Sequence, residues 1–162
     1  MSPAELELLA ATVGQALQQR NQLLTTAESC TGGWVATSLT AIAGSSNWFE
    51  RGFVTYSNAA KVEMLGVPGA TLDQHGAVSE ATAVAMARGA LAHSHADWSL
   101  AITGVAGPGG GSPDKPVGTV CFAWAGPDGH CGSERQHFAG DRESIRAQSV
   151  AHALRGVLER MG

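Results

Sequence analysis

The sequence predicts an α/β protein, a three-layer α/β/α sandwich around a mixed β-sheet, from three observations. Short apolar or β-branched runs alternate along the chain with segments whose apolar residues recur at helical spacing. The first such run passes through a glycine turn directly into a helical segment, the order expected of a parallel strand in an α/β fold. Two later runs flank Gly126 to Gly129, as in an antiparallel hairpin, so the sheet should contain both strand directions.

The N-terminal elements follow from hydrophobic periodicity. Apolar residues at helical spacing predict a first helix over about 4–20. Residues 23–27 form a short apolar and β-branched run that predicts a buried strand. Helical spacing returns over 34–42, and residues 52–56 predict a second strand. The turn at residues 29–33, which contains Gly32 and Gly33, therefore lies between a predicted strand and a predicted helix.

Capping residues place the two helices in the middle of the chain. Asn58 is the expected N-cap of a short helix that carries Lys61 and ends at Gly66. Ser79 is the expected N-cap of a longer helix with an apolar stripe over 83–91.

Apolar runs and glycine-rich breaks define the remaining elements. Residues 98–103 predict a third strand, which leads into a loop at 104–112 that is too glycine-rich for helix or strand. Residues 117–124 and 132–138 are the arms of the expected hairpin, and a last helix should begin near Asp141. The chain shows no repeat and no linker, so one domain over 1–162 is expected.

Composition excludes several classes of function. A net charge of −4 without a basic stripe argues against a nucleic-acid partner. No apolar run approaches the ~18 residues of a membrane span, and the acidic N-terminus is unlike a secretory signal, so we expect a cytoplasmic protein without a membrane partner. The three cysteines offer no C-x-x-C pair and are expected to be reduced. We also expect a homo-oligomer.

Ser29 is the first candidate for chemistry. It follows a predicted buried strand and precedes a glycine turn into a helix, which would expose its hydroxyl at the carboxyl edge of the sheet. Backbone N–H groups at the start of that helix could form an oxyanion hole. A plain helix cap is the equal alternative, since the G-x-S-x-G elbow is absent. Cys30 is a rival nucleophile, although buried cysteine is common.

Lys61 is the candidate base for that serine, because it comes soon after the second strand and could reach the same edge. A lysine can act as a base only if burial or a neighbouring cation lowers its pKa, and most lysines are instead solvated. The six histidines remain possible but unsupported bases. His93 and His95 have no third ligand at a metal spacing, so no metal site is predicted.

Other residues could hold a substrate at this edge. Thr103 and Gly104 end the third strand, and the glycine loop over 104–111 could surround a phosphate with N–H groups. The loop lacks the G-K-[ST] of a P-loop, and no G-x-G-x-x-G follows the first strand, so neither a nucleoside triphosphatase nor a dinucleotide fold is predicted. Arg142, at the entry to the last helix, is a possible phosphate ligand, as a planar donor fork suits that role.

Several ordered motifs then resemble one known family. They are A-E-S-C-T-G-G at 27–33, G-S-S-x-W-F at 44–49, G-F-V-T-Y-S-N-x-x-K at 52–61, H-G-A-V-S at 75–79, T-G-V-A-G-P at 103–108, K-P-V-G-T-V at 115–120 and G-D-R at 140–142. Together they resemble the C-terminal domain family of the competence/damage-inducible protein CinA, over about residues 8–158. The larger N-terminal domain of two-domain members is not present in this sequence, so the chain resembles the stand-alone members, which are nicotinamide-nucleotide amidases.

The resemblance implies roles for particular residues. It implies that Ser29 is the nucleophile and Lys61 the general base, with Tyr56 nearby. It links Thr103 to the site and an arginine to the substrate phosphate. That arginine is most simply Arg142, with Arg146, one turn further along the same helix, as the alternative. Catalysis without metal or cofactor is implied as well.

The expected reaction is removal of the amide of nicotinamide mononucleotide by acyl transfer. Backbone N–H groups at Thr31, Gly32 and Gly33 would stabilise the oxyanion, and Gly104 and Gly107 would contact the substrate. Two alternatives remain open: a catalytically silent pyridine-nucleotide-binding module, and an amidase for another small amide. The sequence does not show whether Ser29 and Lys61 meet.

Overall fold

The computed structural model describes all 162 residues and contains a five-stranded mixed sheet in the order β2-β1-β3-β4-β5. The strands are β1 (Leu24–Glu28), β2 (Phe49–Val54), β3 (Trp98–Gly104), β4 (Thr119–Ala125) and β5 (Cys131–His137). The helices are α1 (Pro3–Arg20), α2 (Trp34–Thr40), α3 (Asn58–Leu65), α4 (Gly69–His75), α5 (Glu80–Ala92) and α6 (Arg142–Met161), with short 3₁₀ turns at Ser45–Asn47 and Pro127–Gly129.

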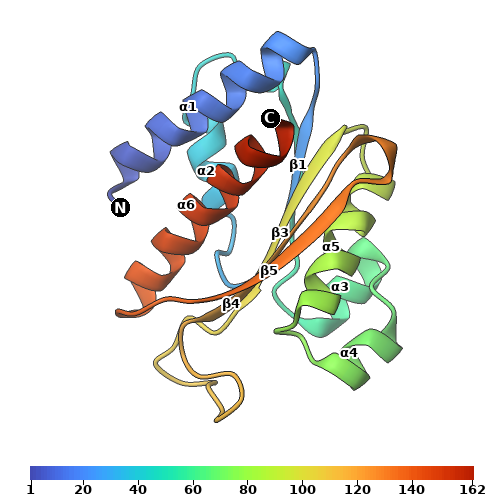
Figure 1. The fold of residues 1–162 in the computed structure, drawn as a ribbon, viewed down its shortest axis with the longest axis vertical. Helices are drawn as coiled ribbons and strands as arrows, with labels where there is room; N and C mark the ends of the chain where they lie inside the picture. Colours follow the sequence, from blue (N-terminus) through green and yellow to red (C-terminus); the bar gives the residue numbers. More distant parts are fainter.

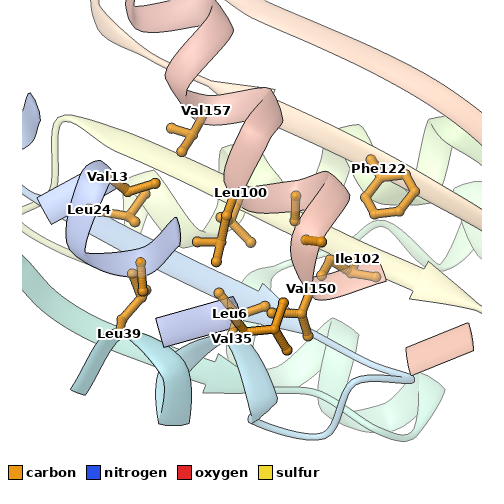
Figure 2. Packing of buried hydrophobic residues seen from close by; sticks show 14 of the residues in the cluster. Leu6, Val13, Leu24, Val35, Leu39, Leu100, Ile102, Phe122, Val150 and Val157 are labelled. Carbon is orange, nitrogen blue, oxygen red and sulfur yellow. The ribbon is translucent and has the colours of Figure 1, made fainter. Parts of the chain in front are cut away.

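Helices cover both faces of this sheet, which confirms the predicted three-layer α/β/α sandwich. Helices α1, α2 and α6 lie on one face and α3, α4 and α5 on the other (Figure 1). The first layer encloses the larger apolar core, in which Leu24 of β1 and Leu100 of β3 pack between Val13 of α1 and Val157 of α6 (Figure 2). The smaller core, rich in alanine, lies under α5.

Strand direction changes once across the sheet. Strands β2, β1 and β3 are parallel, as the sequence predicts, whereas β4 is antiparallel to β3 and β5 antiparallel to β4. Glu28 pairs with Val54 on one side and with Ile102 on the other. The next residue of each parallel strand therefore lies at one level, and these residues are Ser29, Thr55 and Thr103.

The structure corrects two local predictions and adds one helix. Strand β2 begins at Phe49 and ends at Val54, earlier at both ends than the predicted 52–56. The N-cap of α3 is Ser57, whose hydroxyl accepts from the N–H of Ala60, so Asn58 is the first helical residue and not the cap. Helix α4, Gly69–His75, was not predicted because its seven residues follow Pro68 and show no apolar stripe.

Candidate active site

Ser29 lies at the centre of the sheet's carboxyl edge. Its N–H donates to the carbonyl of Ile102 at 3.0 Å, which extends the pairing with β3 by one residue beyond β1. The chain then turns sharply, because the N–H of Gly32 donates back to the carbonyl of Ser29 at 3.0 Å. Gly32 and Gly33 both have a positive φ, +60° and +105°, which side chains with a Cβ rarely adopt. Ser29 therefore does not cap α2, whose N-cap is Gly33 without a side-chain bond.

The structure brings Lys61 to Ser29. Lys61 Nζ lies 3.0 Å from Ser29 Oγ and donates to the carbonyl of Thr55 at 2.9 Å. Lys61 is on the first turn of α3, directly beyond the end of β2, and only 1% of its surface is exposed. No carboxylate forms an ion pair with its amine. Burial lowers the pKa of Lys61 below its usual range, because the protonated amine loses its hydration.

The burial of Lys61 comes from the sheet edge and not from its neighbours on α3. Its neighbours on α3 are the apolar residues Val62 and Met64, but these are 41% and 40% exposed and do not surround the amine. The long side chain instead extends inward to the sheet edge, where it meets Thr55 and Ser29. Glu63, two residues further along α3, is exposed and forms no ion pair with the amine.

Cys30 is the only other nucleophilic side chain beside Ser29, but its thiol belongs to the apolar core. Burial raises the pKa of Cys30 to about 12, and the nearby charge of Glu28 acts in the same direction. The thiol is therefore protonated at neutral pH and is a poor nucleophile.

The expected N–H donors are not all free. The N–H of Gly32 is used in the turn, while those of Cys30, Thr31 and Gly33 make no hydrogen bond to another residue. Thr31 and Gly33 line a second hollow beside α6, whereas Cys30 lines the same pocket as Ser29. Of these residues only Cys30 lines the pocket over Ser29, and donors at Thr31 to Gly33 stay a prediction. Cys30, which follows Ser29, has the better placed N–H.

A pocket of about 290 Å³ opens over Ser29. Its walls come from four segments that are far apart in the sequence. They are the turn after β1, the start of α3 with Tyr56, the segment before α5, and the glycine loop after β3. No histidine lines this pocket, which leaves Lys61 as the candidate base next to Ser29.

Arg142 and Tyr56 form the rim of this pocket. Arg142, the first residue of α6, donates to the carbonyl of Gly107 at 2.7 Å and to the hydroxyl of Tyr56 at 3.1 Å. Tyr56 is 62% exposed and makes no hydrogen bond to Ser29 or Lys61. Arg146 lies away from this rim, because its guanidinium donates to the carbonyls of Cys30 and Thr31 at 3.1 and 3.0 Å.

Thr103, Gly104 and Gly107 lie in the pocket wall, but their contacts are largely with the protein. Thr103 Oγ1 donates to the carbonyl of Ala77 at 2.8 Å and so ties β3 to the segment before α5. A Cβ at Gly104 would lie 2.9 Å from the carbonyl oxygen of Thr119. A Cβ at Gly107, whose φ is +78°, would lie 2.4 Å from a methyl group of Val117. These two glycines are needed for packing and conformation, whatever they contact in a substrate.

Two features of the site were not visible in the sequence. One is Glu28, which is buried and accepts hydrogen bonds from Thr31 and from the start of α2. The other is the backbone carbonyl of Thr55, which no side-chain motif could reveal. The hydroxyl of Thr55 is buried without a hydrogen-bond partner, as is that of Thr26. The only sign of Glu28 in the sequence is its place directly before Ser29.

No group of three or more His, Cys, Asp or Glu side chains is arranged to hold a metal ion. All three cysteines are free thiols. None of the helices combines the length and the apolar character that crossing a bilayer would require.

Known proteins resemble this chain in sequence and in fold. A family model described as the CinA C-terminal domain matches residues 6–161. The nicotinamide-nucleotide amidohydrolase PncC of Escherichia coli K12 is 58% identical over 95% of this chain and 93% of its own length. The protein of the same name from Pseudomonas putida is 54% identical over 93% and 94%. The crystal structure of the competence/damage inducible protein CihA from Agrobacterium tumefaciens superposes with a TM-score of 0.95 at 45% identity, over 98% of each chain.

Proposed function

The chain belongs to the CinA C-terminal domain family, and we propose that it is an amidohydrolase that converts nicotinamide mononucleotide to nicotinic acid mononucleotide and ammonia. Relatives named nicotinamide-nucleotide amidohydrolase are 51–58% identical over nearly the whole chain, which supports the substrate. The observation that carries the proposed mechanism is the 3.0 Å contact between Lys61 Nζ and Ser29 Oγ in a buried setting.

Proton transfer from Ser29 to Lys61 is the first proposed step. Lysine titrates near ~10.4 in water, so it must be made less basic to accept a proton at neutral pH. Burial without a counter-ion acts in that direction. A neutral amine keeps two N–H groups, of which one can donate to the carbonyl of Thr55. Its lone pair is then free to accept the proton of the Ser29 hydroxyl.

Acyl transfer follows from this proton transfer. Ser29 Oγ attacks the amide carbon, and the N–H of Cys30 donates to the oxyanion that forms. The C–N bond then breaks, the proton held by Lys61 passes to the leaving nitrogen, and ammonia departs. A water molecule loses its proton to Lys61, attacks the ester carbon and releases the acid, and the proton returns to Ser29 Oγ. The sum is amide plus water to acid plus ammonia, with no cofactor.

The substrate phosphate is assigned to the rim of the pocket. Arg142 is exposed there, and its guanidinium has donors in addition to those used for Gly107 and Tyr56. Residues Gly109 and Gly110 of the loop line the same pocket, and a Cβ at Gly109 would meet nothing within 4 Å. This stretch of the loop is thus open to a ligand, unlike the part at Gly104 and Gly107.

Ammonia release from nicotinamide mononucleotide tests the proposal, with nicotinamide and the dinucleotide as comparison substrates. We expect turnover of the mononucleotide and little turnover of free nicotinamide, which lacks the phosphate. Tight binding of the mononucleotide without ammonia release would instead identify a binding module. Faster hydrolysis of an unrelated small amide would replace the proposed substrate.

A further inference from the structure

Two charged side chains beside the nucleophile have no part in the mechanism above. Glu28 is 1% exposed, and Arg146 is half-buried on α6. Neither one forms an ion pair. Burying a carboxylate without a counter-ion is costly unless several donors bind it. Their contacts show what each charge does instead.

Glu28 binds the turn and helix that follow Ser29. Its Oε1 accepts from the hydroxyl of Thr31 at 2.7 Å and from the N–H of Val35 at 2.9 Å. Its Oε2 accepts from the N–H of Ala36 at 3.1 Å. All three partners donate, so both oxygens must be acceptors. The carboxylate thereby fixes the side chain of Thr31 relative to the first turn of α2.

Arg146 binds the same turn from the α6 side. Its Nε donates to the carbonyl of Cys30 at 3.1 Å and its Nη2 to the carbonyl of Thr31 at 3.0 Å. Its guanidinium carbon also lies 5.5 Å from the ring centre of Trp34. A peptide unit is planar, so a bond to the carbonyl also fixes the N–H of the same unit. Two successive peptide units after Cys30 are held in this way.

The peptide unit before Cys30 is held within the turn itself, by the bond from the N–H of Gly32 to the carbonyl of Ser29. Three consecutive peptide units are therefore fixed. The first of them carries the N–H of Cys30, which makes no hydrogen bond to another residue and lines the pocket.

From these contacts we propose that Glu28 and Arg146 are positioning residues that together clamp the turn 29–33, and that the clamp sets the direction of Ser29 Oγ and of the Cys30 N–H. The proposal rests on the proposed function for its catalytic meaning. It assigns Arg146 to the nucleophile turn and leaves Arg142 as the ligand of the phosphate. A displacement of about 1 Å in a reacting group can cost on the order of 100-fold in rate, so loosening this turn should lower turnover.

Each variant alters one residue of the clamp. Thr31→Val deletes the hydroxyl that Glu28 binds and keeps the shape of the side chain. Arg146→Ala deletes both bonds to the carbonyls. Glu28→Gln places an NH₂ group among N–H and O–H donors, so at least one of them loses its acceptor. Arg155→Ala is the matched control, since Arg155 is an exposed residue of the same helix that makes no side-chain hydrogen bond or ion pair.

Hydrogen–deuterium exchange of the backbone amides of residues 29–37 is the first measurement. We expect exchange at least about tenfold faster there in Thr31→Val and Arg146→Ala, with the rest of the chain and the Arg155→Ala protein unchanged. Unchanged exchange in both variants overturns the clamp. This measurement needs no substrate, so it decides the clamp even if wild-type protein releases no ammonia from nicotinamide mononucleotide, a result that would refute the proposed function alone.

Steady-state kinetics is the second measurement. For Thr31→Val and Arg146→Ala we expect kcat to fall about 10- to 100-fold while KM stays within about twofold of the wild-type value. The midpoint of the pH–rate profile should not move. Guanidinium ion should restore part of the activity of Arg146→Ala. If Arg146→Ala raises KM and leaves kcat unchanged, Arg146 is a substrate ligand and the proposal is wrong. Glu28→Gln should behave like Thr31→Val, which carries the test if Glu28→Gln does not fold.

Discussion

The amine of Lys61 and the hydroxyl of Ser29 lie 3.0 Å apart, although 32 positions separate the two residues in the chain. Parallel pairing of β1 and β2 explains this contact. The N–H of Thr55 donates to the carbonyl of Glu28 at 2.8 Å, so both strands end at the same level. Ser57 then caps α3, and Lys61 lies on the first turn of this helix.

Replacement of Ser29 should abolish turnover, whereas replacement of its neighbour should not. We expect Ser29→Ala to lower kcat by about four orders of magnitude or more, as for other covalent nucleophiles. Cys30→Ala should keep most of the activity, because the Cys30 thiol is protonated with a pKa of about 12 and packs in the core. Ammonia release measures both, and far-UV circular dichroism checks the fold. An active Ser29→Ala protein beside an inactive Cys30→Ala protein would reverse the assignment.

Activity should depend on pH through Lys61. Burial lowers its pKa, so the amine loses its proton at a lower pH than a solvated lysine does. Because the neutral form is the base, kcat/KM should rise with pH through that lowered pKa. Lys61→Arg should be as inactive as Lys61→Ala, since arginine stays charged. Substantial activity in Lys61→Arg, measured as ammonia release, would show that the residue supplies only charge.

Arg142 should act on binding more than on chemistry. It lies at the pocket rim with its guanidinium exposed, and it contacts Gly107 and Tyr56 but not Ser29. Arg142→Ala is expected to raise KM for the mononucleotide about tenfold or more, with a smaller change in kcat. Tyr56→Phe removes only the hydroxyl that accepts from Arg142 and should show a weaker form of the same effect. An effect confined to kcat in Arg142→Ala would contradict this placement.

Chelation should leave the activity intact. No histidine, aspartate or glutamate lines the pocket over Ser29, and no group of three His, Cys, Asp or Glu side chains could hold a metal ion. Turnover after prolonged dialysis against a chelator is therefore expected to match that of untreated protein. Loss of activity that a divalent ion restores would require a different mechanism.

An ion pair between β5, an edge strand of the sheet, and α6 should make the stability of the protein depend on pH. Glu134 lies 2.6 Å from His152 Nε2 and 3.6 Å from Arg160. Partial burial would raise the pKa of Glu134, but the hydrogen bond and charge of His152 together with the charge of Arg160 lower it overall. A carboxyl whose pKa is lower in the folded state stabilises the protein above its unfolded pKa, and this contribution is lost as the pH falls through the folded pKa.

Glu134→Gln should therefore lower the unfolding midpoint modestly at neutral pH, and the difference from wild type should shrink in acid. The pair is partly exposed, so the effect stays small. Thermal unfolding at several pH values measures it, with the exposed Glu63→Gln as a control. A difference that does not change with pH would show that the ion pair contributes nothing.

Local patterns were sufficient for the layers of the fold and for the position of Ser29 at the sheet edge. The alternation of strands and helices predicts the sandwich, and the strand–glycine turn–helix at 24–40 puts Ser29 at the sheet edge. Errors occur where signals are short or shared. Ser57 and Asn58 are adjacent and both good N-caps, so the pattern alone could not choose between them.

Contacts between distant segments were beyond the reach of local patterns. Arg142 and Arg146 are one turn apart on the same helix, and only the three-dimensional arrangement shows that one faces the pocket and the other the nucleophile turn. The burial of Lys61 likewise arises from the sheet edge, while its own neighbours on α3 are exposed. Backbone groups such as the carbonyl of Thr55 leave no mark on residue type at all.

The buried and unpaired amine of Lys61 also bears on how this protein would respond to selection for heat resistance. An apolar residue at that position would remove a desolvated basic group from the interior, so random libraries screened only for survival at high temperature should accumulate changes at position 61. Such variants would fold well and do no chemistry. Libraries intended to yield thermostable catalysts therefore need lysine to be held fixed at position 61.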